Sequence, residues 1–511
     1  MQQDEIIRRL SAGEGFGGAV PERLDTHISV VFLAGDEAYK LKRAITTSYL
    51  DYGSLAARRR LCEAELAINR RTAPDLYLGV VPVTLTAGGG LVVGEGEGEV
   101  VDWLVRMRRF SQDDLFDRMA EDGRLTEPLL IELADGIARF HDAAGRVTDA
   151  AADRRIAFVI EENAEELRQY LRGDDDRAAI DRFDRASRAA FDVCRAVLAR
   201  RGADGFIRHC HGDLHLRNIC LYDGKPTLFD AIEFSETISH IDVLFDAAFL
   251  LMDLVHRGLR RQANAVFNRY LYRTGDIGDL AILPLFLALR AGIRAHTSAM
   301  AAQGAVDQAR RDRSFATARD YLRLGIDLLQ PAQPVLIAIG GLSGSGKSTV
   351  ARDIAPFAGP PPGALILGTD PIRKQLWGVD PLVPLPPEAY RRATDDAVYD
   401  TLLAHATSAL AAGRSVIADG TFRDPATRRA VEALAASAGA GFDGVWLEAD
   451  AESLIRRVGG RTGDSSDATV PVLREQLATT AGDIEWRRVD AARPLAEVSR
   501  DVGRVLGIHP G

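Results

Sequence analysis

Residues 25 to 110 carry the hydrophobic pattern of a β-rich segment. The stretch "HISVVFLAGDEAYKLKR" contains two runs of β-branched and aromatic residues around a Gly35-Asp36 turn, and "LYLGVVPVTL" continues in the same style. Between them, "SLAARRRLCEAELAINRRTA" has its apolar residues at helical spacing. From about 111 to 330 the pattern becomes mainly helical, with a short β-like insert around "NICLYDGKPTLFDAIEF". The pattern predicts a small β-rich lobe followed by a larger helical lobe, with a cleft between them.

The last third of the chain has a different hydrophobic pattern. Short apolar runs alternate with helical stretches, namely "VLIAIGG", "ALILGTD", "SVIADGT" and "FDGVWLEAD". This order predicts a parallel sheet covered by helices. Pro331 and Pro334 precede the first of these runs and end the preceding helix. The sequence therefore predicts a domain over 1–330, a short linker over 331–334 and a second domain over 335–511.

Composition narrows the class of protein. The chain has 511 residues, a hydrophobic fraction of 46%, a charged fraction of 27% and a formal net charge of −10. These values are typical of a globular protein with two or three domains and give no sign of a surface that coats nucleic acid. Four sparse cysteines, no apolar signal segment at the N-terminus and apolar runs interrupted by charges favour a cytoplasmic protein without a membrane span.

The stretch "GLSGSGKST" fits the phosphate-loop pattern G-x-x-x-x-G-K-[ST] between a predicted strand and a predicted helix. In such a loop the backbone N–H groups surround a phosphate, Lys347 reaches the outer phosphates and Ser348 binds Mg²⁺. The predicted nucleotide-binding residues are Gly341, Ser343, Gly344, Ser345, Gly346, Lys347, Ser348 and Thr349.

Residues downstream of the loop point to phosphoryl transfer. Asp370 follows the second apolar run and can accept a proton from an attacking hydroxyl, with Arg373 three residues further on. Asp419 ends the third run and is the expected partner of the Mg²⁺ shell. Arg457 and Arg461 stand four residues apart on one helical face, where two guanidinium groups could close over the transferring phosphate.

Together, "GLSGSGKST", "TDPIRKQLWG", "ADGTF" and "RVGGRTGDSSDA" resemble the small P-loop kinases that include gluconate kinase, chloramphenicol phosphotransferase, zeta toxins and the polynucleotide 5′-kinase domain. The resemblance covers nearly all of 335–511. It implies that Asp370 is the general base and that Arg457 and Arg461 form the lid. The chain has Asp-Gly-Thr-Phe where this group more often has Asp-Ala-Thr-Phe, and the group acts on very different acceptors.

The stretch "HCHGDLHLRNIC" allows two interpretations. Its histidines and cysteines could bind a metal, but zinc sites usually pair such residues with a second, distant pair, and none is found here. Asp213 and Asn218 instead reproduce the base-to-ligand spacing of a kinase catalytic loop, in which the Asp accepts the hydroxyl proton and the Asn binds Mg²⁺. Asp230, at the end of the following hairpin, is the predicted second metal ligand, and His211 is predicted to orient the loop.

An upstream strand supplies lysines for the same site. Lys40 and Lys42 lie on one face of "AYKLKR", and Glu63 and Glu65 lie on the helix that follows. One lysine is expected to pair with the α- and β-phosphates and one glutamate to hold it. The register against V-A-I-K favours Lys42 over Lys40. Of the two glutamates, Glu63 is the preferred partner and Glu65 is the alternative.

"HGDLHLRN" together with "LFDAIEF" resembles the aminoglycoside phosphotransferase and choline kinase family, which has a protein-kinase-like fold. The resemblance is closest over 205 to 255, and its upstream part is similar to an uncharacterised bacterial branch often fused to a P-loop domain. It implies a structural role for Asp246. No glycine-rich loop precedes the lysine strand, and "DTHIS" takes its place.

The sequence thus predicts an α+β, protein-kinase-like bilobal domain followed by an α/β P-loop NTPase domain. We expect a bifunctional enzyme with ATP and Mg²⁺ as cofactors and small-molecule hydroxyl compounds as acceptors; the sequence indicates no oligomeric state. In one alternative the first domain is a nucleotide-sensing or scaffold module and only the second is catalytic. In another the second domain phosphorylates nucleic-acid 5′ ends, which the lack of an aromatic stacking platform argues against.

Overall fold

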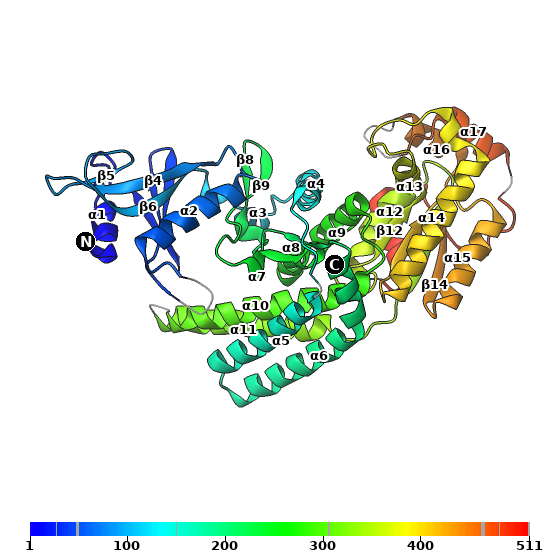
Figure 1. Ribbon diagram of the computed structural model, residues 1–511. Helices are drawn as coiled ribbons and strands as arrows, with labels where there is room; N and C mark the ends of the chain where they lie inside the picture. Colours follow the sequence, from blue (N-terminus) through cyan, green and yellow to red (C-terminus); the bar gives the residue numbers. More distant parts are fainter. Residues whose placement is uncertain are drawn as a thin grey trace. The chain divides into compact units, whose positions relative to one another are not determined.

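The computed structural model describes residues 1–26, 28–46, 51–149, 151–304, 307–460, 466–479 and 481–508 (Figure 1). The chain divides into two compact units. The first comprises Met1–Ile156 and Leu198–Asp253, and the second Ala157–Val197 and Leu254–Gly511.

The first unit begins with a six-stranded antiparallel sheet in the order β1-β2-β3-β6-β4-β5. The Gly35-Asp36 turn joins β2 to β3, as predicted. Helix α1 packs on one face of the sheet through Ile6, Ile7 and Leu10, and α2 covers the other face. The elements are α1 (Gln3–Ser11), β1 (Glu22–Asp25), β2 (Ser29–Ala34), β3 (Glu37–Lys42), α2 (Leu55–Asn69), β4 (Tyr77–Leu85), β5 (Leu91–Val93) and β6 (Glu99–Arg108).

The rest of the first unit is mainly helical and contains two short β-pairs. The predicted β-like insert is the hairpin of β8 and β9, and β7 pairs with β10. The buried helix α8 provides the carboxylates that hold the segment after β7. The elements are α3 (Phe116–Glu121), α4 (Glu127–Ala143), β7 (Ile207–His209), β8 (Ile219–Tyr222), β9 (Lys225–Leu228), α7 (Glu236–Ser239), β10 (His240–Asp242) and α8 (Val243–His256).

Long helices form the first part of the second unit: α5 (Ala152–Tyr170), α6 (Asp174–Ala203), α9 (Arg260–Thr274), α10 (Leu283–Gln303) and α11 (Gln308–Leu328). Among the described residues, one helical segment, Leu280–Gln303, is long and apolar enough to cross a membrane, and 67% of its apolar window is buried inside the protein. Burial of this kind is also typical of the core helix of a globular domain.

The remainder of the second unit is the predicted α/β domain. Its five strands are all parallel, in the order β12-β13-β11-β14-β15. The elements are β11 (Val335–Gly341), α12 (Lys347–Ile354), β12 (Leu365–Gly368), α13 (Thr369–Leu376), α14 (Arg392–Ala411), β13 (Val416–Asp419), α15 (Pro425–Ser437), β14 (Gly441–Glu448), α16 (Ala451–Gly459), α17 (Val470–Ala478), β15 (Arg487–Asp490) and α18 (Leu495–Leu506).

The fold class predicted from sequence is confirmed. The predicted linker over 331–334 joins α11 to β11 and lies inside the second unit. The boundary between the two compact units therefore differs from the predicted domain boundary at 331–334. The reason is that α9 packs directly against the α/β domain.

Candidate active sites

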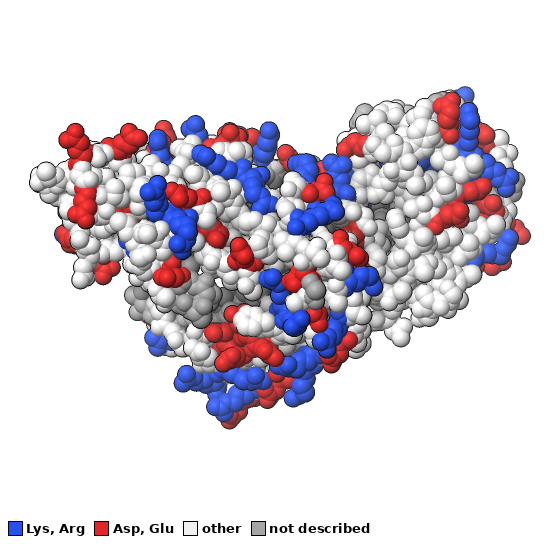
Figure 2. Space-filling model, viewed as in Figure 1, with Lys and Arg blue, Asp and Glu red and all other residues white. Residues whose placement is uncertain are grey.

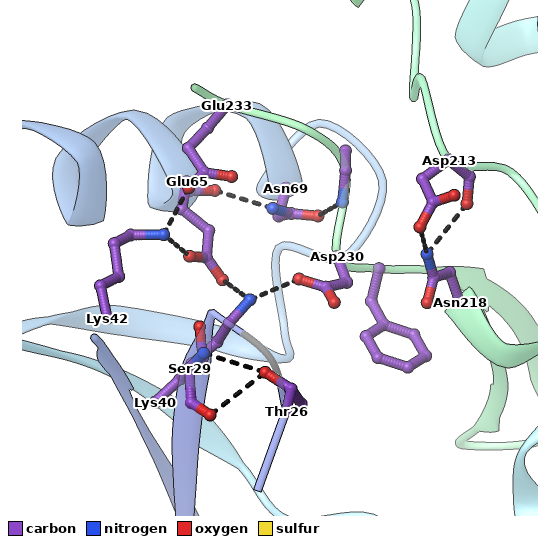
Figure 3. Close-up of polar contacts among 12 residues, drawn as sticks. Thr26, Ser29, Lys40, Lys42, Glu65, Asn69, Asp213, Asn218, Asp230 and Glu233 are labelled. Carbon is purple, nitrogen blue, oxygen red and sulfur yellow. Dashed lines mark hydrogen bonds and ion pairs between the residues drawn. The ribbon is translucent and has the colours of Figure 1, made fainter. Parts of the chain in front are cut away.

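In the first unit, the two lysines of β3 meet a single glutamate of α2 (Figure 3). Lys40 Nζ lies 2.9 Å from Glu65 Oε1, and Lys42 contacts the other oxygen of the same carboxylate. Lys40 also pairs with Asp230, whereas Lys42 pairs with Glu233. Lys42 and Glu65 are almost fully buried, and Lys40 keeps 12% of its side chain exposed. Lys40 is therefore the more accessible of the two lysines. It also lies beside Asp230, the predicted metal ligand.

This geometry corrects two predictions. Glu63 does not hold a lysine, because its side chain is 53% exposed and pairs with Arg59 on its own helix. Lys42, predicted to reach the nucleotide, is instead enclosed between Glu65 and Glu233. Residues two apart on a strand share a face, so alternation alone could not separate Lys40 from Lys42. A sequence signal for Lys40 did exist: an alanine stands two positions before the lysine, as in V-A-I-K.

The electrostatics of the cluster keep all three groups charged. Burial lowers the pKa of Lys40, but the carboxylates of Asp230 and Glu65 outweigh it and leave that pKa well above its usual value. The pKa of Lys42 is raised in the same way by Glu233 and Glu65 against its burial. Burial raises the pKa of Glu65, and the two lysines reverse the effect, so that this pKa is lowered. Buried charges are tolerated here because each has a partner of opposite sign.

The predicted catalytic loop brings its base and its amide together. Asn218 Nδ2 donates to Asp213 Oδ2 at 2.8 Å and to the Asp213 carbonyl at 2.9 Å. His215 Nε2 lies 3.3 Å from Asp213 Oδ2, so a second side chain contacts the same carboxylate. The Asp213 side chain remains 36% exposed and can be reached by a substrate.

The loop is held from behind by buried polar groups. His211 Nε2 lies 2.9 Å from the Phe229 carbonyl, and its Nδ1 accepts from the Asp213 N–H at 3.3 Å. Burial lowers the pKa of His211, which favours a neutral ring that donates through Nε2. Asp246 accepts from the backbone N–H groups of His211 and Gly212 at 3.0 and 2.9 Å. The contacts of His211 are those expected of the predicted orienting histidine, and the contacts of Asp246 are those expected of the predicted structural aspartate.

One cysteine of this stretch belongs to a group of possible metal ligands. Within the described parts of the chain, His141, Cys210 and Asp246 form a buried group whose possible ligand atoms lie within 4.8 Å of one another. Asp246 is already engaged by two backbone N–H groups and by His141 Nε2 at 3.1 Å. The Asp246 carboxylate is therefore already used in hydrogen bonds that hold the loop.

The two predicted metal ligands flank the β8–β9 hairpin. Asn218 directly precedes β8, Asp230 comes two residues after the end of β9, and Ile219 pairs with Leu228. A further bond, from the Phe229 N–H to the Asn218 carbonyl at 3.0 Å, ties the two ends together. The hairpin therefore brings two ligands that are twelve positions apart to one end of a β-ladder.

Asp230 has an unusual backbone conformation. Its φ is +61°, in the left-handed region that costs energy for residues other than glycine. Its N–H donates to the Tyr77 hydroxyl at 3.1 Å, and the next N–H, of Ala231, donates to Asn69 Oδ1 at 2.9 Å. Two side chains from the β-rich part thus hold the turn that directs the Asp230 carboxylate toward Lys40.

In the second unit the predicted phosphate loop has the expected form. It connects β11 to α12, with Gly344 and Gly346 in the left-handed region at φ +85° and +91°. A side chain at Gly346 would also collide with Leu495, at 2.3 Å. Lys347, Ser348 and Thr349 form the first turn of α12. Helix and loop N–H groups that face one space are a suitable site for phosphate.

Three neighbouring strand ends bring the predicted residues of this site to one edge of the sheet. Ile339 of β11 pairs with Asp419 of β13, and Gly368 of β12 pairs with the same Asp419. Ser348 Oγ donates to Asp419 Oδ2 at 2.5 Å, so the two predicted Mg²⁺ ligands are in contact. Asp370 is the second residue of α13, directly after β12. Open parallel sheets bind their ligands at this edge.

The predicted arginine lid differs from expectation. The Arg457 guanidinium donates to the backbone carbonyls of Ala491, Ala492 and Arg493 at 2.7, 3.3 and 2.9 Å. Its fork of donors matches these carbonyls, so in this structure it stabilises the segment after β15. Arg461 lies outside the described residues. Arg373, expected near the loop, instead pairs with Asp395 of α14 at 2.7 Å.

Two residues of the sites were not predicted. Glu233 neutralises Lys42 and accepts from the Tyr52 hydroxyl at 2.7 Å. Its position three residues after Asp230 was the only available signal. Gln476 of α17 accepts from the Ser343 N–H of the phosphate loop at 3.0 Å, and no local motif marks it.

Two family models match the chain. Residues 57–283 match the phosphotransferase enzyme family, and residues 336–482 match an AAA domain model. The first range contains Glu65, Asp213, Asn218 and Asp230, and the second contains the phosphate loop. The enzyme class expected from the motifs, an ATP-dependent kinase or phosphotransferase, is thereby confirmed.

The chain is also similar to other proteins, over nearly its whole length or over one part of it. Uncharacterized proteins of Mycobacterium tuberculosis and Mycobacterium bovis are 32% identical over 493 residues, which is 95% of this chain and 94% of theirs. A gluconokinase from Sinorhizobium meliloti covers 34% of the chain and 92% of its own, at 27% identity and a TM-score of 0.24. A choline/ethanolamine kinase family protein from Mesorhizobium loti covers 64% and 99%, at 15% identity and a TM-score of 0.39. The chain therefore belongs to the same family as these mycobacterial proteins, and it is a kinase-type enzyme in which a phosphotransferase-family domain precedes a P-loop kinase domain.

Proposed function

We propose that the protein is a bifunctional phosphotransferase with two Mg·ATP sites, each moving a γ-phosphoryl group to a hydroxyl of a small-molecule acceptor. The observation that carries the proposal is the Lys40–Glu65–Asp230 cluster. In this cluster Lys40, which can bind phosphate, lies beside the Asp230 carboxylate, which can bind a metal ion. The accessible Asp213 belongs to the same domain. The second domain has an independent phosphate loop.

In the first site the residue types fit magnesium and triphosphate. Carboxylate and amide oxygens are the ligands that Mg²⁺ prefers, and Asn218 and Asp230 would provide them. Lys40 would exchange its contact with Asp230 for phosphate oxygens while Glu65 keeps it in place. Asp213 would accept the proton of the attacking hydroxyl, with Asn218 and His215 orienting its carboxylate.

In the second site the donors are mainly backbone N–H groups. Ser345 Oγ is buried within the phosphate loop and has no hydrogen-bond partner, which supports a ligand with acceptor oxygens there. Ser348 and Asp419 would hold Mg²⁺, and Lys347 would bind the outer phosphates. Among the described residues, no hydrogen bond or ion pair engages the Asp370 carboxylate, so it is available as a base. Bound Mg·ATP supplies the transferable phosphoryl group and neutralises its charge.

The acceptors are proposed to be small-molecule hydroxyl compounds, acted on in the cytoplasm. On the face drawn in Figure 2, basic and acidic side chains are interspersed rather than gathered into a basic stripe. Nucleic-acid binding depends on such a stripe, because phosphate contacts dominate affinity. The mixed surface supports small molecules over nucleic-acid ends.

A second candidate, in which the first domain is a scaffold, has an observation in its favour. Thr26 and Ser29 close a tight turn between β1 and β2, where kinase-like enzymes carry a glycine-rich loop. The Ser29 N–H donates to Thr26 Oγ1 and is therefore not offered to a triphosphate. The two candidates differ only in whether the first site transfers phosphate.

The test is a γ-phosphoryl transfer screen from labelled ATP to sugars, aminoglycosides, nucleosides and nucleic-acid ends. It compares the wild type with Asp213→Asn and Lys347→Ala. Two working sites predict that each variant loses a different set of products. If Asp213→Asn leaves every product in place, the scaffold alternative is correct, and if Lys347→Ala does so, the P-loop assignment fails.

A further inference from the structure

Helix α9 lies in the region that matches the phosphotransferase family, yet it completes the sheet of the P-loop domain within the second unit. Strand β12 is at the edge of that sheet, and within the described parts of the chain it pairs with β13 alone. On the β13 side, the Leu365 N–H donates to the Ser415 carbonyl at 2.9 Å. The outward backbone groups of β12 would be exposed on an uncovered edge.

One side chain of α9 takes the place of the missing strand. Asn268 Oδ1 accepts from the Ile366 N–H at 2.7 Å, and Asn268 Nδ2 donates to the Ala364 carbonyl at 3.2 Å. A primary amide has a donor and an acceptor side by side, so it can bond a strand edge as a peptide group does. Asn264, one turn earlier and 3% exposed, donates to the carbonyls of Pro362 and Ala364 at 3.0 Å each.

The packing around this contact leaves little room for adjustment. A side chain at Gly363, where φ is +101°, would lie 2.9 Å from Asn264 Nδ2 and closer still to the Ala355 carbonyl. Buried Arg414 donates to the carbonyls of the 360–363 segment, and its guanidinium lies 5.8 Å from the Phe267 ring of α9. A register or tilt error in β12 would therefore disturb several buried contacts.

The strand leads directly to the proposed base. β12 ends at Gly368, and Asp370 follows in the first turn of α13. A second bond reaches α13 itself, from Gln375 Nε2 to the Tyr272 carbonyl at 2.6 Å. The strand that precedes Asp370 and the helix that carries it are thus both tied to α9.

We infer that α9 is a working part of the P-loop active site and that Asn268 is a positioning residue that acts through Asp370. The second site therefore depends on a helix of the first domain, whichever acceptor it uses. The inference rests on the proposed role of Asp370 as the base.

The test is a double-mutant cycle in full-length protein that carries Asp213→Asn to silence the first site. The probe is Mg·ATP with water as the phosphoryl acceptor, measured as phosphate release above an Lys347→Ala blank. Asn268→Ala is expected to lower kcat about tenfold with the KM for ATP nearly unchanged, because a misplaced base slows transfer without weakening nucleotide binding. In an Asp370→Asn background the same change should have no further effect.

Arg261→Ala is the matched control, because Arg261 is an exposed residue of the same helix and pairs with Asp353 of α12, away from β12. It should keep the parent rate. If Asn268→Ala fails to fold, Gln375→Ala tests the second contact of α9, the bond from α13 to the Tyr272 carbonyl, and should lower kcat by a smaller factor. If Asn268→Ala and Asp370→Asn lower the rate independently, so that their factors multiply in the double variant, the inference is wrong. An unchanged rate in Asn268→Ala would also overturn it. Neither result would affect the proposed role of Asp370. Hydrolysis unaffected by Asp370→Asn would instead refute the proposed base.

Discussion

The two candidate sites hold phosphate-binding groups in different ways. In the first, two lysines from β3 meet carboxylates that come from α2 and from the segment after β9, nearly two hundred residues away. In the second, nine consecutive residues provide most of the donors, and the remaining groups follow neighbouring strands. A site built from buried ion pairs depends on tertiary packing, whereas a phosphate loop depends mainly on local backbone conformation.

The largest effect is expected for Glu65. Glu65→Gln leaves Lys40 and Lys42 without their shared carboxylate, and breaking a buried ion pair costs about 3–5 kcal/mol. Urea unfolding combined with amide exchange in β3 and α2 would measure the loss. Glu63→Gln is the control, because this exposed residue should change the free energy of unfolding by less than about 0.5 kcal/mol. Equal effects of Glu65→Gln and Glu63→Gln would contradict this account and favour the prediction from sequence, in which Glu63 holds the lysine.

The two lysines should separate function from stability. Lys40→Met is expected to lower first-site phosphoryl transfer about 100-fold or more, since it removes the cation proposed to face the phosphates. Lys42→Met should instead destabilise the first unit, because Glu233 loses its partner in a buried place. Rates and unfolding curves of the two variants would show the separation. A stable Lys42→Met variant that has lost transfer would contradict it.

Arg457 tests whether the second site has a lid. Arg457→Ala removes hydrogen bonds to three backbone carbonyls and should cost about 1–2 kcal/mol of stability. Arg456→Ala, at the neighbouring exposed position, serves as the control and should cost less. If Arg457→Ala lowers kcat of the second site and leaves the melting temperature unchanged, the residue acts on the phosphate and not on the fold.

The smallest effect concerns pH. Burial raises the pKa of Asp467, but hydrogen bonds from Lys374 and Tyr390 outweigh it and hold that pKa below its usual 3.8. A lowered pKa in the folded state means that the carboxylate stabilises the protein above pH 3.8, and that this contribution disappears as the pH falls through the folded value. Asp467→Asn should therefore cost about 1 kcal/mol near neutral pH and progressively less in acid. A cost independent of pH would exclude the ion pair as its source.

Local patterns were sufficient to mark the phosphate loop, Asp419 and the Asp213–Asn218 spacing, because each lies within a short segment of the sequence. They did not reveal the α8 carboxylates that hold the catalytic loop or the contacts of Arg457. The parallel sheet followed from alternating strands and helices, which place Ser348 and Asp419 at one edge.

The groups that sequence reasoning missed depend on distant contacts. The choice between Glu63 and Glu65 depends on which face of α2 meets the sheet, and the helix has apolar residues on more than one side. The partners of Arg457 are backbone carbonyls, which carry no side-chain signal. The bond of Asn268 to β12 joins residues 98 positions apart, and neither segment contains a motif that predicts it.

The most direct test of two sites is a calorimetric titration of the full-length protein with a non-hydrolysable ATP analogue and Mg²⁺. Two bound nucleotides per chain are predicted for the wild type, one for Lys347→Ala and one for Lys40→Met. A wild-type stoichiometry of one that falls to zero in Lys347→Ala would contradict the account.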